Sequence, residues 1–441
     1  MNDVESAYQK TLDFLYSFVD YSLQKTFRYS PEKFNLERMR AFSAALGNPH
    51  QQYPVLHVAG TKGKGSVSAM CASALRSAGY HVGIYTSPHL QDYTERIQVD
   101  GVPISHEGLT ALVDEIRPVI ASIPELTTFE ITTALAFLYF ARQGVNAGVI
   151  EVGLGGRLDS TNIVIPRVAV ITSLSYDHTH ILGNTLAEIA GEKAGIIKPG
   201  IPVVLAPQKD EARQTVERIA AERGSPLVQV GRDVRFEPLA HSLEGQSLLV
   251  WPAGAQAPLE LSIPLLGEHQ VENAATAFAT LQTACQAGFA VSDEAIRQGF
   301  ASVYWPGRFE VLRRDPPVVI DSAHNRDSAL KLRKTLDDYF PSFPVIMVFG
   351  ASEDKDIPGM LTELLPRVNS VIVTRSFHPR AANPDQLVQT ITEMGRPAKS
   401  IPELEDAVIA ALQEGGTESL VLVTGSIFVA AGARDVWQNL K

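Results

Sequence analysis

Val55-Leu56-His57-Val58-Ala59-Gly60-Thr61-Lys62-Gly63-Lys64-Gly65-Ser66 is an apolar run that leads directly into a glycine-rich turn. This order predicts a buried strand that ends in a phosphate-binding loop, and residues 67–78 are expected to form the helix behind it. The glycines let backbone N–H groups approach an anion closely, and Lys64 can reach the β- and γ-phosphates of a nucleotide. The segment therefore predicts an α/β fold with a phosphate site at one edge of a sheet.

The loop differs from the common pattern G-x-x-x-x-G-K-[ST] at two points. Val58 stands at the first glycine of that pattern, and Gly65 separates Lys64 from Ser66. A glycine-rich surface turn that binds nothing is the alternative interpretation of this segment taken alone.

Composition bounds the class of protein. The chain has 441 residues, of which 45% are hydrophobic and 20% charged, which is typical of a globular protein of two or three domains. A net charge of −11 argues against a nucleic acid or an anionic membrane as partner, since both need a basic surface.

The two cysteines, Cys71 and Cys285, both lie in apolar segments, so buried free thiols are expected rather than a disulfide framework. The N-terminus lacks the pattern of a signal peptide, and no apolar stretch reaches the roughly 20 residues of a membrane span. We therefore expect a cytoplasmic protein.

Strand-like and helix-like runs alternate after residue 55, which predicts a parallel sheet covered by helices. Residues 1–50 are expected to form a lead-in helix pair interrupted at Pro31, and residues 226–264 a small antiparallel appendage. A second α/β series begins near residue 305, after an alanine-rich helix over 271–287. The predicted strands surround His57 and span 82–85, 147–152, 168–173 and 203–206 in the first series, and 318–320, 345–349, 370–374 and 420–424 in the second.

Polar motifs follow these strands, at the edge where parallel sheets bind ligands. Thr86-Ser87-Pro88-His89 follows the second strand, and the Ser87 hydroxyl could complete a magnesium shell; a proline turn with a capping serine is the alternative. Glu151 ends the third strand before a glycine-rich loop, Gly153 to Asn162. A carboxylate beside a bound triphosphate is a natural magnesium ligand.

Two further segments carry candidate residues. Tyr176-Asp177-His178-Thr179-His180 follows the next strand, where an imidazole could bind a metal or hold a water; a structural histidine is the alternative. Residues 188–200 are predicted helical, with Lys193 on the more apolar face. Buried beside carboxylates, Lys193 would neutralise phosphate charge or, with a lowered pKa, react with carbon dioxide to give a metal-bridging carbamate. An exposed, salt-bridged lysine is the alternative.

In the second series, Val319-Ile320-Asp321-Ser322-Ala323-His324-Asn325 again places a polar loop after a strand, with Arg308 just before it. Together these side chains could bind a nucleotide from the second domain. The Thr424-Gly425-Ser426 turn carries a weaker signal and is expected to cap a helix.

Taken in order, these motifs resemble the Mur ligase superfamily and, within it, the folylpolyglutamate synthase/dihydrofolate synthase family, from about residue 30 to the C-terminus. The inserted Gly65 and the Gly155–Asp159 segment are similar to the folate branch, and Lys62 replaces the asparagine that many relatives carry. The motifs are Gly60–Ser66, Thr86–His89, Glu151–Asn162, Asp177-His178, Glu192-Lys193, His269–Asn273 and Asp321–Asn325.

The resemblance implies an α/β protein with a P-loop NTPase-like domain over 1–304 and a Rossmann-like domain over 305–441, with ATP and the substrates between them. It also implies magnesium at one or two sites. Lys64, His178 and Lys193 would serve catalysis. By the family pattern, the ATP phosphates would contact Gly60, Thr61, Lys62, Gly63, Lys64, Gly65 and Ser66; Mg²⁺ would bind Ser87, Glu151 and His178; Lys193 would be carbamylated; the nucleotide would contact Asn273, Arg308, Asp321 and His324; and the folate cleft would lie near Arg96, Phe129, Thr133 and Asp159.

The implied reaction joins L-glutamate to dihydropteroate, to reduced folates or to both, through an acyl phosphate. A cell-wall Mur ligase acting on a UDP-muramyl substrate is the first alternative, but only about 55 residues precede the loop, too few for its usual extra domain. A regulatory GTPase is the second, and it expects a guanine-reading N-K-x-D element that we do not find. The sequence leaves open the acceptor, the length of the glutamate chain, carbamylation, a potassium requirement and the oligomeric state, for which the resemblance favours a monomer.

Overall fold

The structure is a computed structural model that describes residues 3–19 and 36–440, and the chain divides into two compact units. The predicted break at Pro31 lies outside the described residues. Unit 1 comprises Met1–Leu239, Ser247–Ile263 and Glu272–Val303, and unit 2 comprises Ala240–Gln246, Pro264–Val271 and Tyr304–Lys441.

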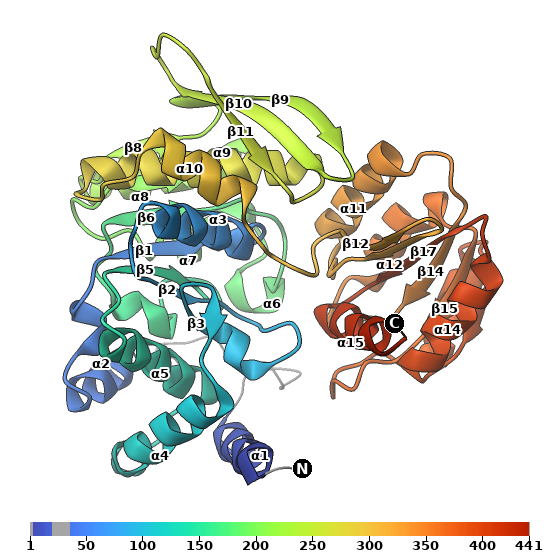
Figure 1. The fold of residues 1–441 in the computed structure, drawn as a ribbon, viewed down its shortest axis with the longest axis horizontal. Helices are drawn as coiled ribbons and strands as arrows, with labels where there is room; N and C mark the ends of the chain where they lie inside the picture. The colour runs from blue at the N-terminus through green and yellow to red at the C-terminus, as the bar shows by residue number, and fades with distance from the viewer. Residues whose placement is uncertain (1–2, 20–35, 441) are drawn as a thin grey trace. The chain divides into compact units, whose positions relative to one another are not determined.

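Unit 1 is built on an eight-stranded sheet with the order β4-β3-β2-β5-β1-β6-β7-β8 (Figure 1). The strands β2, β5, β1, β6, β7 and β8 pair with their neighbours in parallel. The strands β3 and β4 extend the sheet beyond β2 as an antiparallel edge. The strands are β1 (Val55–Ala59), β2 (Val82–Tyr85), β3 (Ile97–Val99), β4 (Val102–Pro103), β5 (Ala147–Glu151), β6 (Val168–Ile171), β7 (Val203–Leu205) and β8 (Leu227–Gln229).

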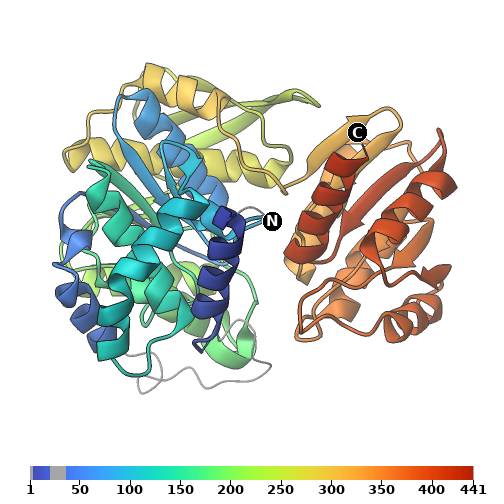
Figure 2. The same cartoon turned by 60° about the horizontal axis from the view of Figure 1, so that its bottom comes forward.

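Every residue of the central strands β1, β2, β5 and β6 is buried, as expected for a parallel sheet covered on both faces. Figure 1 shows α3, α9 and α10 over one face and α4 and α5 over the other, and Figure 2 shows α1 beside α4. Within the described residues, the helices and 3₁₀ turns (η) are α1 (Asp3–Tyr16), α2 (Leu36–Ala45), η1 (Pro49–Gln51), α3 (Lys64–Ser77), η2 (Tyr93–Arg96), α4 (His106–Ser122), α5 (Thr128–Arg142), η3 (Ser160–Ile163), α6 (Thr179–Leu182), α7 (Leu186–Ala194), α8 (Asp210–Glu222), α9 (Glu268–Gln286), α10 (Asp293–Ala301), α11 (Arg326–Tyr339), α12 (Ile357–Leu364), η4 (Leu365–Arg367), α13 (Pro384–Glu393), α14 (Leu404–Gly415) and α15 (Ile427–Asn439).

The register of the sheet brings the candidate loops together. Val58 pairs with Glu151, and Ala59 pairs with Ile171, so β1, β5 and β6 end at the same level. The loops that follow these strands therefore share one edge, which is where the sequence predicts the phosphate loop and its polar neighbours.

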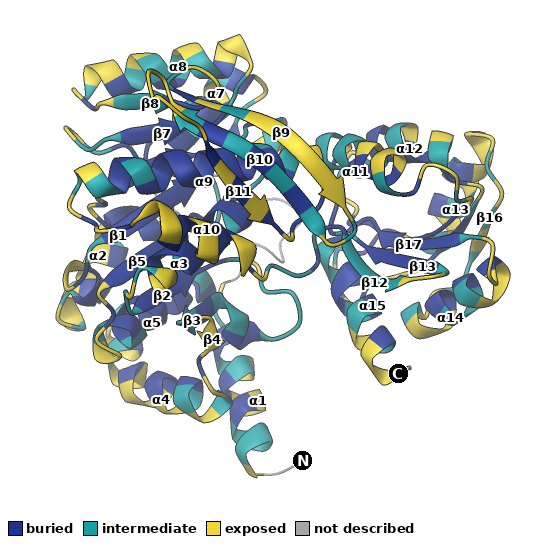
Figure 3. Cartoon of the chain, turned by 45° about the horizontal axis from the view of Figure 1, so that its top comes forward, coloured by how far each residue is buried: buried dark blue, intermediate teal, exposed yellow. Residues whose placement is uncertain are grey.

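A separate three-stranded sheet has the order β11-β10-β9, with β9 (Val234–Ser242), β10 (Gly245–Pro252) and β11 (Leu259–Ile263). Buried and exposed residues alternate along β11, whereas β9 is exposed over most of its length (Figure 3). This is the predicted antiparallel appendage, but it begins later than expected. The segment Leu227–Gln229 instead pairs in parallel with β7 in the main sheet.

Unit 2 contains a six-stranded sheet with the order β12-β13-β17-β14-β15-β16, parallel except for β12. Successive residues of its strands belong to two different apolar clusters, because side chains alternate between the faces of a sheet. Val319 and Met347 belong to one cluster, and Val318 and Ile346 belong to the other. Helices on both faces cover these clusters, which confirms the predicted Rossmann-like α/β architecture. The strands are β12 (Glu310–Arg314), β13 (Pro317–Ile320), β14 (Val345–Phe349), β15 (Ser370–Val373), β16 (Ala398–Ser400) and β17 (Leu420–Thr424).

Three sequence predictions need correction. The helix expected over 188–200 begins at Leu186 and ends at Ala194, with Gly195 as its C-cap; a Cβ at Gly195 would lie 2.3 Å from the Arg157 Cβ, so this position requires glycine. Helix α3 begins at Lys64 rather than at residue 67. Cys285 is half-buried instead of buried, although both cysteines are free thiols as expected.

Candidate active site

Two glycines of the loop after β1 lie where a side chain would be strained and would collide with a neighbouring residue. At Gly60, where φ is +155°, a Cβ would lie 1.8 Å from Thr172 Oγ1. At Gly63, where φ is +87°, it would lie 2.2 Å from the side-chain oxygen of Asn273 on α9. The loop thus packs against the residue that follows β6 and against α9, and Asn273, predicted to contact the nucleotide, lies beside it.

The first half of this loop is tied to the loop that follows β6. The backbone N–H groups of Thr61 and Lys62 both donate to the carbonyl of Ser173 at 3.0 Å. The Lys62 ammonium donates to Asp177 Oδ2 at 3.2 Å, and both side chains are largely buried. Lys62 therefore holds the segment Asp177-His178 next to the phosphate loop.

The second half of the loop forms the N-terminus of α3. The helix begins at Lys64, and its N-cap residue Gly63 has no side chain with which to accept the first-turn N–H groups. Those N–H groups and the positive end of the helix dipole favour an anion, so this end of α3 is suited to a phosphate.

Lys64, the first residue of α3, and Glu151, the last residue of β5, face each other, with Lys64 Nζ 3.9 Å from Glu151 Oε1. The other Glu151 oxygen accepts from the backbone N–H of Ser87 at 3.1 Å. The structure thus brings together a buried carboxylate, a lysine of the phosphate loop and the serine after β2. Carboxylate and hydroxyl oxygens are donors that Mg²⁺ prefers, so the residue types at positions 151 and 87 fit a magnesium site.

His178 lies on the adjoining loop after β6. Its backbone is left-handed, with φ at +49°, and it precedes the first residue of α6. Its Nε2 atom is 3.7 Å from Asp177 Oδ1, which places the ring beside the carboxylate that Lys62 holds. Among the described residues no group of three His, Cys, Asp or Glu side chains could hold a metal; the predicted set has two, with a serine hydroxyl as the third donor.

Lys193 is buried at the end of α7, with an exposed fraction of 5%, so the alternative of an exposed lysine is wrong. Its ammonium donates to the carbonyl of Gly60 at 2.8 Å, so it contacts the phosphate loop directly. Burial, and then the charge of Lys64, lower the pKa of Lys193 to about 7. A substantial fraction of this amine is therefore neutral near neutral pH, which is the form that reacts with carbon dioxide.

The glycine-rich loop after β5 is anchored on α7. A Cβ at Gly156 would lie 2.7 Å from the carbonyl oxygen of Lys193, and the Arg157 N–H donates to the Glu192 carbonyl at 2.8 Å. Inside this loop, the buried Asp159 carboxylate accepts four hydrogen bonds, from the N–H groups of Gly153, Leu154 and Thr161 and from the Thr161 hydroxyl. Asp159, predicted to lie near the folate cleft, is thus placed where it holds the loop together.

The other three predicted folate-side residues lie on the same side of unit 1. Phe129, on α5, packs so closely on Gly153 that a Cβ there would lie 2.4 Å from its ring. Thr133, one turn later, shares a 3.1 Å hydrogen bond with the hydroxyl of Tyr85. Arg96 Nε donates to His89 Nδ1 at 2.9 Å, and burial followed by the charge of Arg96 lowers the pKa of His89 to about 3.

Within unit 2, the remaining predicted residues gather where β13 ends. Asp321 accepts from the N–H groups of Phe309 and Ala323, each at 2.8 Å, so it fixes the turn that carries Arg308. His324 Nδ1 lies 2.9 Å from the carbonyl of Ser322. Asp321 thus links the turn that carries Arg308 to the segment after β13 that carries His324.

Comparison with known proteins agrees with this architecture. Residues 58–281 match the Mur ligase middle domain, and residues 307–427 match the Mur ligase glutamate ligase domain. The chain is 38% identical to the dihydrofolate synthase/folylpolyglutamate synthase of Bacillus subtilis, over 93% of this chain and 95% of that protein. It is 36% identical to the protein of the same name from Mycobacterium tuberculosis, over 91% and 90%.

The chain is a Mur ligase of the dihydrofolate synthase/folylpolyglutamate synthase family.

Solved structures support the same conclusion for this ligase. Folylpolyglutamate synthase of Mycobacterium tuberculosis, complexed with ADP, superposes with a TM-score of 0.89 at 33% identity, covering 99% of each chain. Escherichia coli FolC in complex with DHPP and ADP gives 0.87 at 34% identity over the whole of both chains. The enzyme is thus an ATP-dependent ligase of the folate branch, and the cell-wall and GTPase alternatives are not supported.

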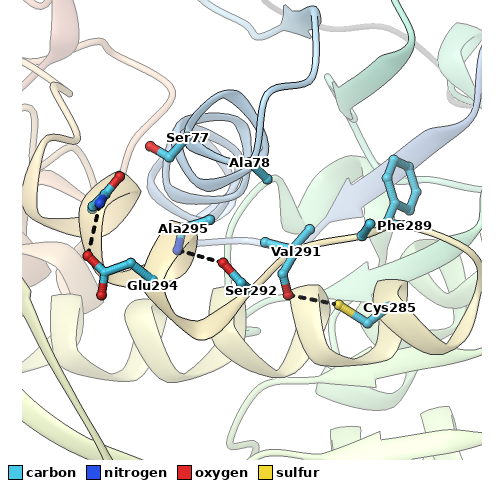
Figure 4. A pocket seen from close by; sticks show the side chains of 10 residues that line it. Ser77, Ala78, Cys285, Phe289, Val291, Ser292, Glu294 and Ala295 are labelled. Carbon is cyan, nitrogen blue, oxygen red and sulfur yellow. Dashed lines mark hydrogen bonds between the residues drawn. The ribbon is translucent and has the colours of Figure 1, made fainter.

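A cavity of about 590 Å³ in this ligase lies away from the phosphate loop, at the other end of α3 (Figure 4). It is bounded by Ser77 and Ala78, by Cys285, and by the segment that leads into α10. Because α3 has 14 residues, the two sites are about 20 Å apart along the helix. None of the predicted site residues lines this cavity.

The chain holds one feature of the site that sequence reasoning missed. His57 is fully buried in β1 and shares a 2.8 Å hydrogen bond with Thr161 of the glycine-rich loop. Its signal was a polar residue in the middle of an otherwise apolar strand. Among the described residues, no helix of the ligase is long and apolar enough to cross a membrane.

Proposed function

We propose that this ligase joins L-glutamate to dihydropteroate and to reduced folates in the cytoplasm, as a monomer, at the cost of one ATP per amide bond. The observation that carries the proposal is the set of three groups around the phosphate loop. Lys64 lies 3.9 Å from Glu151, and Lys193 donates to the carbonyl of Gly60 at 2.8 Å, so two amines and a carboxylate lie around the loop that would bind the phosphates.

The reaction proceeds in two steps. A carboxylate oxygen of the acceptor attacks the γ-phosphorus of ATP, the bond to the β-phosphate oxygen breaks, and an acyl phosphate and ADP form. The amino nitrogen of L-glutamate then attacks the acyl carbon, inorganic phosphate leaves with its oxygen, and the nitrogen loses a proton as the amide forms.

In both steps, residues of this chain stabilise the negative charge of the phosphate groups. The acceptor carboxylate and the triphosphate repel each other, and Lys64 and the N–H groups at the start of α3 offset that repulsion. Lys62 and Asn273 complete the phosphate side, because one ties the loop to Asp177 and the other packs on Gly63. These contacts hold the loop in place before the nucleotide binds, so little reorganisation is needed.

Glu151, Ser87 and His178 would hold Mg²⁺, which when bound neutralises phosphate charge and polarises the γ-phosphoryl group. The lowered pKa of Lys193 favours its carbamate, and the carbamate would add a second anionic oxygen donor beside the loop. A requirement for K⁺ is tested by replacing it with Na⁺ in the assay.

We further propose two domains, 1–304 and 305–441. Arg308, Asp321 and His324 of the second domain would contact the nucleotide, since Asp321 orders the turn that presents Arg308. Arg96, Phe129, Thr133 and Asp159 would bound the folate side.

The test is incorporation of labelled L-glutamate by the purified protein with ATP, in parallel with dihydropteroate and with tetrahydrofolate, followed by separation of products by length. Incorporation with both acceptors supports the bifunctional function, and incorporation with one assigns a single acceptor. Lys64→Met serves as the matched inactive control. Absence of incorporation with both, in protein that binds ADP, refutes the proposal and directs the assay to UDP-muramyl acceptors.

A further inference from the structure

His57 is the one polar residue of β1, and its exposed fraction is 0%. Side chains alternate along a strand, so His57 lies on the same face as Val55 and Ala59. Those neighbours belong to two different apolar clusters, and the imidazole lies between them. A polar group in such a place is costly unless it forms a hydrogen bond, so its partner defines its role.

The partner is Thr161, and the hydrogen bonds around it determine which ring nitrogen carries the proton. Thr161 Oγ1 is 2.5 Å from Asp159 Oδ1 and 2.8 Å from His57 Nε2. The carboxylate already receives three backbone N–H groups, so it acts as acceptor and takes the single hydroxyl proton of Thr161. The hydroxyl oxygen must therefore accept from His57, and Nε2 carries the proton.

This assignment also accounts for the other ring nitrogen. Nδ1 of His57 has no hydrogen-bond partner within the part of the chain that the structure describes. With the proton on Nε2, Nδ1 is unprotonated and has only a lone pair. The one N–H group of the ring then has Thr161 as its acceptor. Burial, and then the charge of Lys198, lower the pKa of His57 to about 3, so the ring stays neutral.

The hydrogen bonds continue from β1 to the loop behind Glu151. His57 donates to Thr161, Thr161 donates to Asp159, and the second Asp159 oxygen accepts from the N–H groups of Gly153 and Leu154. Gly153 is two residues after Glu151, and His57 is three residues before Gly60. One strand thus carries the phosphate loop at its end and, through a side chain, fixes the loop that follows the predicted metal carboxylate.

We propose that His57 is a positioning residue of the ligation reaction, which acts through Thr161 and Asp159 to hold the 153–162 loop and thereby the Glu151 carboxylate. It touches neither nucleotide nor acceptor. Loss of its donor is expected to lower kcat about 10–100-fold and raise the Mg²⁺ concentration for half-maximal rate, the usual effect of losing a group that orients a metal ligand. The KM for ATP should change less than about 3-fold, because the phosphate loop itself is untouched.

Two substitutions of His57 by amide side chains distinguish a role in hydrogen bonding to Thr161 from a role in filling space in the core. In His57→Gln the side-chain nitrogen can occupy the place of Nε2 and still donate to Thr161. In His57→Asn the nitrogen lies nearer the place of Nδ1 and cannot reach. The proposal predicts kcat close to wild type for Gln and the full loss for Asn. Thr161→Ser keeps the linking hydroxyl and should leave kcat close to wild type. Thr161→Val removes that hydroxyl and should show the full loss of kcat.

The activity readout rests on the proposed function, so a second readout is taken on the protein without nucleotide or metal. Hydrogen exchange of the peptide covering 152–162 should accelerate in His57→Asn and in Thr161→Val, and stay at the wild-type rate in His57→Gln and Thr161→Ser. Equal exchange in all four variants, or equal kcat for Gln and Asn, overturns the role of His57. A wild-type protein that ligates no glutamate but shows the predicted exchange pattern refutes the proposed function alone.

Discussion

Lys193 makes a quantitative prediction about the pH dependence of folding. Burial and Lys64 lower its pKa from 10.5 in the unfolded chain to about 7 in the folded protein. Between these two values the unfolded chain binds a proton that the folded protein does not, so the contribution of Lys193 to stability rises with pH. Below about pH 7 both states are protonated, and the cost of burying the charge is fully present.

The size of the effect follows from the pKa. Each pH unit inside this window changes the free energy of unfolding by about 1.4 kcal/mol, and the slope is smaller near pH 7, where the folded group is half-titrated. The Lys193 contribution should therefore become more favourable by about 2 kcal/mol between pH 7 and pH 9. Lys193→Met removes the titrating group, keeps the length of the side chain, and should remove that increment.

The assay is urea unfolding of wild type and Lys193→Met at pH 7, 8 and 9, without nucleotide and with carbon dioxide removed so that no carbamate forms. The difference in unfolding free energy between the two proteins should shift by about 2 kcal/mol over this range. Lys209→Met, at an exposed position, is the matched control and should show no such shift. Parallel pH curves for wild type and Lys193→Met would refute the buried, weakly basic amine.

Three further predictions concern the same loops. Glu151→Gln should lower kcat about 100-fold and raise the Mg²⁺ needed for half-maximal rate, because the anionic oxygen that would hold Mg²⁺ beside the loop is replaced by a neutral amide. An unchanged magnesium titration contradicts its ligand role. Gly63→Ala should weaken ADP binding in calorimetry by about 10-fold or more, because a Cβ there would lie 2.2 Å from the side-chain oxygen of Asn273. Gly79→Ala is the control: its φ is similar, at +88°, but no atom lies near its Cβ, so the affinity for ADP should not change. A double-mutant cycle with Lys62→Met and Asp177→Asn should give a coupling energy of about 1 kcal/mol in thermal unfolding, since the two side chains are largely buried and 3.2 Å apart. Additive effects of the two substitutions would show that this contact does not stabilise the protein.

The sequence allowed the parallel sheets to be predicted because their strands are buried on both faces. Strands such as Val82–Tyr85 and Val345–Phe349 are continuous apolar runs, and the structure confirms both exactly as bounded. The edge hairpin of β3 and β4 was missed, because a strand of two exposed residues, Val102–Pro103, has no alternation to detect. Strand order also could not be read from the sequence, since it depends on pairings between distant segments.

The candidate residues could be named from motifs, but their partners could not. Lys193 was expected beside carboxylates, and the charges of Asp177 and Asp159 do act on it, but its hydrogen bond to the carbonyl of Gly60 could not be predicted. Asn273 meets Gly63 only because α9 packs on the loop after β1, a contact that no local pattern encodes. His57 went unnoticed because the apolar pattern of its strand was sufficient to predict the fold without it.

The central claim is that the acceptor carboxylate is activated by transfer of the γ-phosphoryl group of ATP. The most direct measurement uses an acceptor with ¹⁸O in both oxygens of that carboxylate and follows the label by mass spectrometry of the inorganic phosphate released. Attack of the carboxylate on phosphorus predicts one ¹⁸O in phosphate for each glutamate joined. Phosphate without ¹⁸O, in a reaction that forms the amide, would contradict the mechanism.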